Sequence, residues 1–119
     1  MDKKIYNLGV PILGICYGMQ LTAFELGGRV KAGNKREYGP TDIKIIKKSS
    51  LFAGLKPKQI TWMSHGDQVG KLPTGFMKIA ASVNCPIAAM ADEKNKIYGL
   101  QFHPEGMHTK NGTKILQNF

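Results

Sequence analysis

Residues 10–28, VPILGICYGMQLTAFELGG, contain the change of pattern that decides the fold. Residues 10–15 form a short apolar run without charge, as expected for a buried parallel strand. After Tyr17 the apolar residues recur at helical spacing, which indicates an amphipathic helix. Gly27 and Gly28 can end this helix because glycine tolerates the left-handed conformation. The sequence therefore predicts a strand, a sharp turn at Cys16 and a helix.

The turn has the form Gly-x-Cys-x-Gly, from Gly14 to Gly18, which is the cysteine counterpart of the Gly-x-Ser-x-Gly nucleophile elbow. We expect both glycines to be required, because a strand that turns directly into a helix brings two backbones too close for side chains. The turn would hold Cys16 in strained geometry at a helix N-terminus, where the dipole favours the thiolate. The backbone N–H of Tyr17 would point toward an oxyanion on an attacked carbonyl. Cys16 is therefore the candidate nucleophile, and Tyr17 the candidate oxyanion-hole residue.

A second motif, His103-Pro104-Glu105, follows an expected strand at residues 96–102. Proline ends the strand and keeps the segment extended, so that residues two apart project from the same side. Glu105 could then bond one ring nitrogen of His103 while the other nitrogen faces a nucleophile. This is the arrangement of a base and its orienting carboxylate in a catalytic triad. Together with Cys16, the motif predicts a Cys-His-Glu triad.

The rest of the chain predicts several strands and few helices. Residues 29–40 are polar and contain glycine and proline, which is typical of a loop. Residues 50–54 indicate a helical turn capped by Ser49 or Ser50, and residues 113–119 begin a terminal helix. Further strands are expected at residues 41–47, 59–64, 76–83, 86–91 and 96–102. We therefore expect one α/β domain over residues 1–119, with a mixed, mainly parallel sheet flanked by helices.

Composition limits the partners and the compartment. Lys and Arg number 17 against 8 Asp and Glu, a net charge of +9, but the lysines are scattered and lack interleaved stacking aromatics. We therefore expect a lysine-rich solvated surface and no nucleic-acid partner. The apolar runs are too short for a bilayer and no signal core follows the N-terminus, so no membrane partner and a cytoplasmic location are expected. Cys16 and Cys85 form no Cys-x-x-Cys unit, which predicts neither a disulfide nor a metal site, and Cys85 is interpreted as a buried small residue.

Several segments resemble, in the same order, the glutaminase domain of the class I glutamine amidotransferases, and within that family the GMP synthase branch. They are GICYGMQ at residues 14–20, REYG at 36–39, WMSHGD at 62–67, CPIAAM at 85–90 and GLQFHPE at 99–105. The resemblance covers nearly the whole chain. The elbow and the His-Pro-Glu motif mark the class, whereas WMSHGD and the pair His108-Thr109 point to the GMP synthase branch.

The resemblance implies an enzyme with a flavodoxin-like fold, in which Cys16 attacks the side-chain amide of glutamine. His103 would act as general base and then acid, and Glu105 would orient it. The bound glutamine would be contacted by Gln20, Ser64, His65 and Gly66. Ammonia would pass to an ATP-dependent synthetase domain or subunit that aminates XMP to GMP. ATP and Mg²⁺ are expected in that synthetase domain, and no cofactor or metal in the glutaminase domain.

Two departures from the family pattern bear on activity. The family's domain begins well upstream, with a first strand and a glycine-rich loop that supplies the second oxyanion donor. We therefore expect an N-terminally truncated chain that lacks the first strands and has little glutaminase activity alone. Gly106-Met107 stands where the family usually has Val-Thr, which affects the docking surface more than the triad.

Two alternative functions stay open. The chain could be a non-catalytic docking or regulatory module for a synthetase, although the intact triad argues against this. It could also be the glutaminase subunit of another amidotransferase, serving anthranilate, carbamoyl phosphate or CTP synthesis. The WMSHGD segment at residues 62–67 favours the GMP synthase branch over these.

Overall fold

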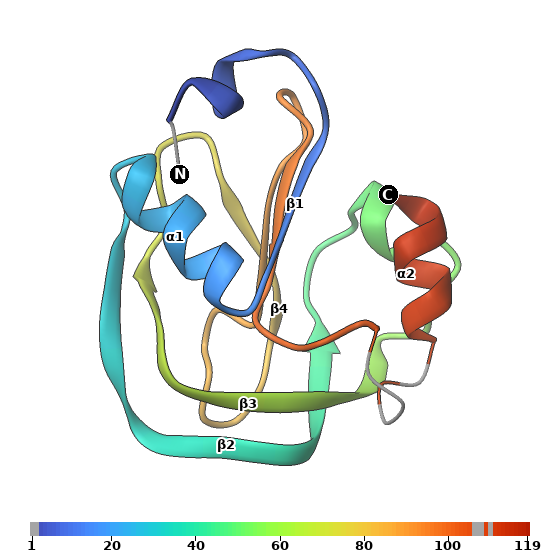
Figure 1. The fold of residues 1–119 in the computed structure, drawn as a ribbon. Coiled ribbons are helices and arrows are strands. Elements are labelled where there is room, and N and C mark those ends of the chain that lie inside the picture. Colours follow the sequence, from blue (N-terminus) through green and yellow to red (C-terminus); the bar gives the residue numbers. More distant parts are fainter. Residues whose placement is uncertain (1–2, 106–108, 110) are drawn as a thin grey trace.

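The structure, a computed structural model, describes residues 3–105, 109 and 111–119. One six-stranded sheet has the order β1-β6-β5-β4-β2-β3 (Figure 1). Its strands are β1 (Ile12–Ile15), β2 (Arg29–Ile45), β3 (Lys58–Lys71), β4 (Met77–Ala81), β5 (Ala89–Asp92) and β6 (Ile97–Leu100). The helices are the α-helices α1 (Tyr17–Glu25) and α2 (Gly112–Asn118) and the 3-10 helices η1 (Lys3–Asn7) and η2 (Ser50–Phe52). The predicted α/β fold, with a mixed sheet flanked by helices, is confirmed.

Parallel pairing is less extensive than the sequence predicts. Among the described strands, β1 and β6 pair in parallel, whereas β6–β5, β5–β4, β4–β2 and β2–β3 are antiparallel. The reason lies in the connections, because a tight turn returns the chain antiparallel whereas a parallel pair needs a longer crossover. The turn at residues 93–96, for example, joins β5 directly to β6.

The central strands β5 and β6 are buried on both faces. Leu100 of β6 lies in one apolar cluster with Phe52 of η2 and Ile115 of α2. Met90 of β5 lies in a second cluster with Met19 of α1. Figure 1 shows α1 and α2 on opposite sides of these strands. Neighbouring residues along a strand point to opposite faces, so the two helices cover the two faces of the sheet's centre.

The prediction of a loop at residues 29–40 is wrong, because β2 starts at Arg29 and pairs with β3 along most of its length. β2 pairs with β4 only at its end, through Lys44 and Ile45. The rest of β2 therefore has β3 as its neighbour, and the two form the long curved ribbon of Figure 1. Such an edge ribbon accepts Pro40, several glycines and a register irregularity between Ala32 and Glu37. These are the features that indicate a loop when read from sequence alone.

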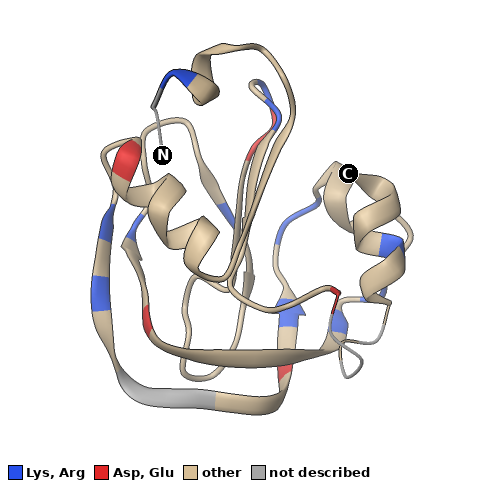
Figure 2. Cartoon of the chain, in the orientation of Figure 1, with Lys and Arg blue, Asp and Glu red and all other residues tan. Residues whose placement is uncertain are grey.

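Basic residues are spread over several strands, helices and turns, as Figure 2 shows. Seven of the scattered lysines lie between residues 44 and 78, and six of them are exposed, namely Lys44, Lys47, Lys48, Lys56, Lys58 and Lys71. The seventh, Lys78, is half-buried. The expected solvated lysine surface is confirmed for the six exposed lysines. Within the described residues, neither α-helix has the length and apolarity that crossing a bilayer requires.

Candidate active site

Cys16 lies at the turn between β1 and α1, as predicted. Its backbone has φ 56° and ψ −109°, a conformation that a non-glycine residue adopts only under strain. The Cys16 N–H donates to the carbonyl oxygen of Leu100 at 2.6 Å, and the Cys16 carbonyl accepts from the N–H of Gln20 at 3.2 Å. The turn is therefore fixed by β6 on one side and by α1 on the other.

The two glycines of the elbow differ in what they do. A Cβ atom on Gly14 would lie 2.6 Å from the carbonyl oxygen of Gly18, so the approach of strand to helix requires glycine there. A Cβ atom on Gly18 would meet no heavy atom within 4 Å. The requirement for two glycines is confirmed for Gly14 and wrong for Gly18, because Gly18 offers its backbone to the contact while its own side-chain position faces open space.

The Cys16 thiol has two polar neighbours from distant parts of the chain. It donates to the carbonyl oxygen of Ser64 in β3, with 3.6 Å between Sγ and oxygen. It accepts from the carboxamide of Gln101, with 3.7 Å between Sγ and Nε2. Burial raises the pKa of Cys16, and hydrogen bonds from the Tyr17 N–H and from Gln101 lower it, while the Glu105 charge raises it. The net pKa is above the ordinary value, because burial outweighs these hydrogen bonds, and the expected effect of the helix dipole on the thiolate stays a prediction.

His103 and Glu105 lie just beyond the end of β6. The Nδ1 atom of His103 is 2.8 Å from Oε1 of Glu105, which confirms the predicted contact. The two hydrogen bonds of Cys16 Sγ are to Ser64 and Gln101. In the described part of the chain, no hydrogen bond joins Cys16 Sγ to His103. Catalytic hydrogen bonds are often long until substrate is present. The role of the pair in catalysis therefore stays a prediction.

Of the predicted glutamine-binding residues, Gln20 lies on α1, whereas Ser64, His65 and Gly66 lie on β3, where the Ser64 carbonyl oxygen contacts the thiol. Gln20 donates through Nε2 to the carbonyl oxygen of Asp67 at 3.0 Å and to Oε1 of Gln101 at 3.3 Å. Nδ1 of buried His65 lies 2.9 Å from the Asp67 carbonyl oxygen, with Gly66 between them in β3. Gln20 and His65 therefore meet at the Asp67 carbonyl oxygen, and the binding of glutamine by these residues stays a prediction.

Sequence reasoning assigned no role to Gln101 and treated Thr109 only as a marker of the family branch. Gln101 is fully buried between Leu100 and Phe102, and its side chain reaches the sulfur. The available signal was a carboxamide inside an otherwise apolar strand segment, since a buried polar side chain needs a partner. Thr109 is also buried, and its hydroxyl contacts the backbone of His103.

Other sequence predictions concern residues away from this site. Cys85 is fully buried and its thiol donates to the carbonyl oxygen of Ile87 at 3.3 Å, as expected for a small core residue. Gly106, Met107 and His108 lie outside the described residues. Among the residues that are described, no three potential metal ligands gather.

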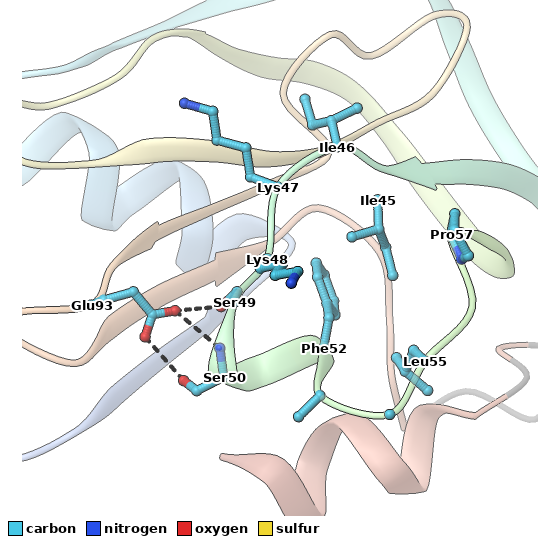
Figure 3. A pocket seen from close by; sticks show the side chains of 12 residues that line it. Ile45, Ile46, Lys47, Lys48, Ser49, Ser50, Phe52, Leu55, Pro57 and Glu93 are labelled. Carbon is cyan, nitrogen blue, oxygen red and sulfur yellow. Dashed lines mark hydrogen bonds between the residues drawn. The ribbon is translucent and has the colours of Figure 1, made fainter.

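A cavity of about 650 Å³ lies between the end of β2, η2 and the β5–β6 turn (Figure 3). Its apolar wall is formed by Ile45, Ile46, Phe52, Leu55 and Pro57. Glu93 at its edge is held by Ser49 and Ser50. Among the described residues, its lining includes no cysteine or histidine. Glu93 precedes β6, whereas Gln101 and His103 follow it. This cavity is therefore separate from the candidate active site.

Comparison with known proteins gives a consistent result. A family model described as "Glutamine amidotransferase class-I" matches residues 1–119. The chain is 56% identical over 119 residues to a GMP synthase [glutamine-hydrolyzing] of Clostridium novyi. It is 52% identical over 120 residues to the protein of that name from Pediococcus pentosaceus. Each match covers 100% of this chain and 23% of the relative, so the chain spans about a quarter of their length.

Solved structures match the fold over nearly the whole chain. A Thermoplasma acidophilum protein, provisionally assigned as one of the subunits of GMP synthase, has a TM-score of 0.93 at 34% identity. The match covers 98% of this chain and 58% of that one. A glutamine amidotransferase of Thermotoga maritima has a TM-score of 0.81 at 26% identity, with coverage of 98% and 47%.

Proposed function

Because the chain belongs to the class I glutamine amidotransferase family, we propose that it forms a Cys-His-Glu glutaminase site that supplies ammonia for GMP synthesis. The observation that carries the proposal is the strained backbone of Cys16 at the junction of β1 and α1. Backbone strain costs free energy and is found mainly at functional sites, so a cysteine that served only in packing would not be expected to keep it. The His103–Glu105 contact, just beyond the end of the neighbouring strand β6, supplies a base with its orienting carboxylate.

The proposed reaction begins with proton transfer from the Cys16 thiol to Nε2 of His103. The raised pKa of Cys16 makes this base necessary, because burial keeps the thiol protonated in the free protein. The sulfur attacks the Cδ carbonyl of glutamine and a C–S bond forms. His103 returns its proton to the leaving nitrogen, the C–N bond breaks, and ammonia departs from a γ-glutamyl thioester. Water activated by His103 then releases glutamate and restores the thiol.

The residues around Cys16 have complementary roles in this proposal. Glu105 orients His103 through Nδ1 and stabilises the imidazolium. The Tyr17 N–H, which hydrogen-bonds the sulfur in the free protein, would donate to the oxyanion of the tetrahedral intermediate. Gln20, Ser64, His65 and Gly66 would bind the glutamine. Both hydrogen bonds of the Gln20 side chain use its Nε2 atom, so its Oε1 oxygen is the group that would accept a hydrogen bond from glutamine.

Ammonia from this site would serve an ATP-dependent synthetase domain or subunit that aminates XMP. ATP and Mg²⁺ would belong to that synthetase. The names of the curated relatives, at 56% and 52% identity, favour this assignment over a glutaminase for anthranilate, carbamoyl phosphate or CTP synthesis.

The test is labelling with a glutamine-analogue electrophile, with and without competing glutamine, followed by peptide mapping. We expect glutamine-protected labelling of Cys16 and none of Cys85, which is buried and serves as the internal control. The Glu105→Gln variant should label more slowly than the wild type while keeping glutamine protection. Equal labelling of both cysteines, or labelling of Cys16 that glutamine does not slow, would contradict the proposal and favour a non-catalytic docking module.

A further inference from the structure

We propose that Gln101 is a further catalytic residue, whose carboxamide N–H group donates to the sulfur of Cys16 and stabilises its thiolate. We also propose that Gln20 is a positioning residue that fixes the orientation of this carboxamide. The inference rests on the proposed function, because it takes Cys16 as the nucleophile. It concerns how a buried cysteine at this elbow can ionise.

The orientation of the two carboxamides follows from a backbone carbonyl. The oxygen of Asp67 can only accept a hydrogen bond, so the Gln20 atom 3.0 Å away from it must be Nε2. The same Nε2 lies 3.3 Å from the Gln101 side chain, and the Gln101 atom that faces it must therefore be the acceptor Oε1. This leaves Nε2 of Gln101 directed at Sγ of Cys16, 3.7 Å away. A chain of hydrogen bonds thus links the Asp67 carbonyl oxygen, through Gln20 and Gln101, to the sulfur.

Gln101 belongs to the same rigid framework as Cys16. Its backbone N–H donates to the carbonyl oxygen of Ala88 at 2.8 Å, and the preceding residue, Leu100, accepts from the Cys16 N–H at 2.6 Å. The Gln101 side chain is fully buried. A buried carboxamide is costly unless both of its ends are paired, and here its partners are Gln20 and the sulfur. An apolar side chain could fill this position, so the carboxamide is explained by its hydrogen bonds to Gln20 and to the sulfur.

The chemical consequence concerns the charged form of the nucleophile. Donors bond an anionic acceptor more strongly than a neutral one, so the contact favours the thiolate over the thiol. It acts against burial, which raises the pKa of Cys16, and against the negative charge of Glu105. The elements around the thiol also carry titratable groups, and His103 lies next to Glu105. These groups are Tyr17 and Glu25 on α1, Tyr98 on β6, and Lys58, His65, Asp67 and Lys71 on β3. Gln101 is the uncharged side chain that donates directly to the sulfur.

The experiment measures the pH dependence of Cys16 alkylation by iodoacetamide in the 119-residue chain, with Cys85 as the buried internal control. Gln101→Met keeps a long unbranched side chain but removes the donor. We expect it to raise the apparent pKa of Cys16 by about one unit, equivalent to a roughly tenfold slower alkylation at pH 7. Gln101→Glu keeps the shape, adds a negative charge and should raise the apparent pKa further. A folded Gln101→Met variant with an unchanged titration of Cys16 would overturn the proposal.

Gln20→Met tests the positioning role at a half-buried helix position, so it does not depend on the folding of the Gln101 variants. We expect a smaller rise in the apparent pKa of Cys16 than in Gln101→Met. In the double variant, Gln20→Met should add nothing to Gln101→Met, because Gln20 acts through Gln101. Additive effects, or no effect of Gln20→Met alone, would contradict its positioning role.

Alkylation needs no glutamine, so the two proposals fail in different ways. Glutamine-protected labelling of Cys16 combined with an unchanged pKa in the variants would leave the glutaminase function standing and remove the role of Gln101. A shifted pKa without glutamine protection would leave the thiolate contact standing and remove the glutaminase function.

Discussion

The backbone of His103 is joined to the backbone of Trp62 at two points. The His103 N–H donates to the Trp62 carbonyl oxygen at 3.0 Å. In return, the Trp62 N–H donates to Oγ1 of Thr109 at 2.8 Å, and that hydroxyl donates to the His103 carbonyl oxygen. Pro104 follows His103 and has no N–H of its own to fix the segment. β3 therefore fixes the candidate base through one direct backbone hydrogen bond and through one threonine hydroxyl.

Thr109→Val should loosen this attachment, because it keeps the shape of the side chain and removes the hydroxyl. We expect the free energy of unfolding to fall by about 1–3 kcal/mol, the usual effect of leaving buried backbone groups unpaired. Labelling of Cys16 by the glutamine analogue should also slow. Thr109→Ser keeps the hydroxyl and should stay close to wild type in urea unfolding and in labelling rate. Indistinguishable valine and serine variants would refute the role of this hydroxyl.

The elbow glycines provide a matched pair of alanine substitutions. Gly14→Ala places a Cβ atom 2.6 Å from the Gly18 carbonyl oxygen, and we expect it to lower the free energy of unfolding by about 1–3 kcal/mol. Gly18→Ala meets no atom within 4 Å and lies in the first turn of α1, where alanine favours the helix. It should be neutral or stabilising. Urea unfolding of both variants checks this, and equal losses would show that the elbow contact is not the cause.

Strain at Cys16 can be measured by comparing two variants that both lack the nucleophile. Glycine accepts the φ of 56° without a Cβ atom, whereas alanine keeps the Cβ atom and with it the strain. Relief of strain of about 1–3 kcal/mol is partly offset by the larger entropy of an unfolded glycine. We therefore expect Cys16→Gly to be about 1 kcal/mol more stable than Cys16→Ala in thermal or urea unfolding. An alanine variant of equal or higher stability would mean that the turn is not strained.

The parts of this molecule that sequence reasoning predicts are those where local chemistry dictates the backbone. The Gly14–Gly18 elbow and the His103–Glu105 contact are of this kind, since each depends on residues within a few positions. The extent of β2 is not, because its polar, glycine-containing residues adopt a strand only once β3 pairs with them. Gln101 was missed for a related reason. Its partners, Cys16 and Gln20, are distant in sequence and meet it only in the folded sheet.

Glu93 gives a pH-dependent test of the β5–β6 turn. Its carboxylate accepts hydrogen bonds from the Ser49 hydroxyl, from the N–H and hydroxyl of Ser50, and from the Tyr98 hydroxyl. Burial raises the pKa of Glu93, but the hydrogen bonds from Ser49, Ser50 and Tyr98 outweigh it and set the pKa below its ordinary value of 4.5. A carboxyl group whose pKa is lowered in the folded state stabilises that state above the unfolded pKa, and the stabilisation is lost as the pH falls through the folded pKa.

Glu93→Gln should therefore be less stable than the wild type at neutral pH, and the difference should shrink as the pH falls below about 4.5. Urea unfolding from pH 7 down to pH 3 measures this difference directly. Glu25→Gln on α1 is the control, since the described residues supply no comparable set of donors to that carboxylate. If the difference between wild type and Glu93→Gln stays constant over this range, the hydroxyl groups of Ser49, Ser50 and Tyr98 do not favour the ionised carboxylate.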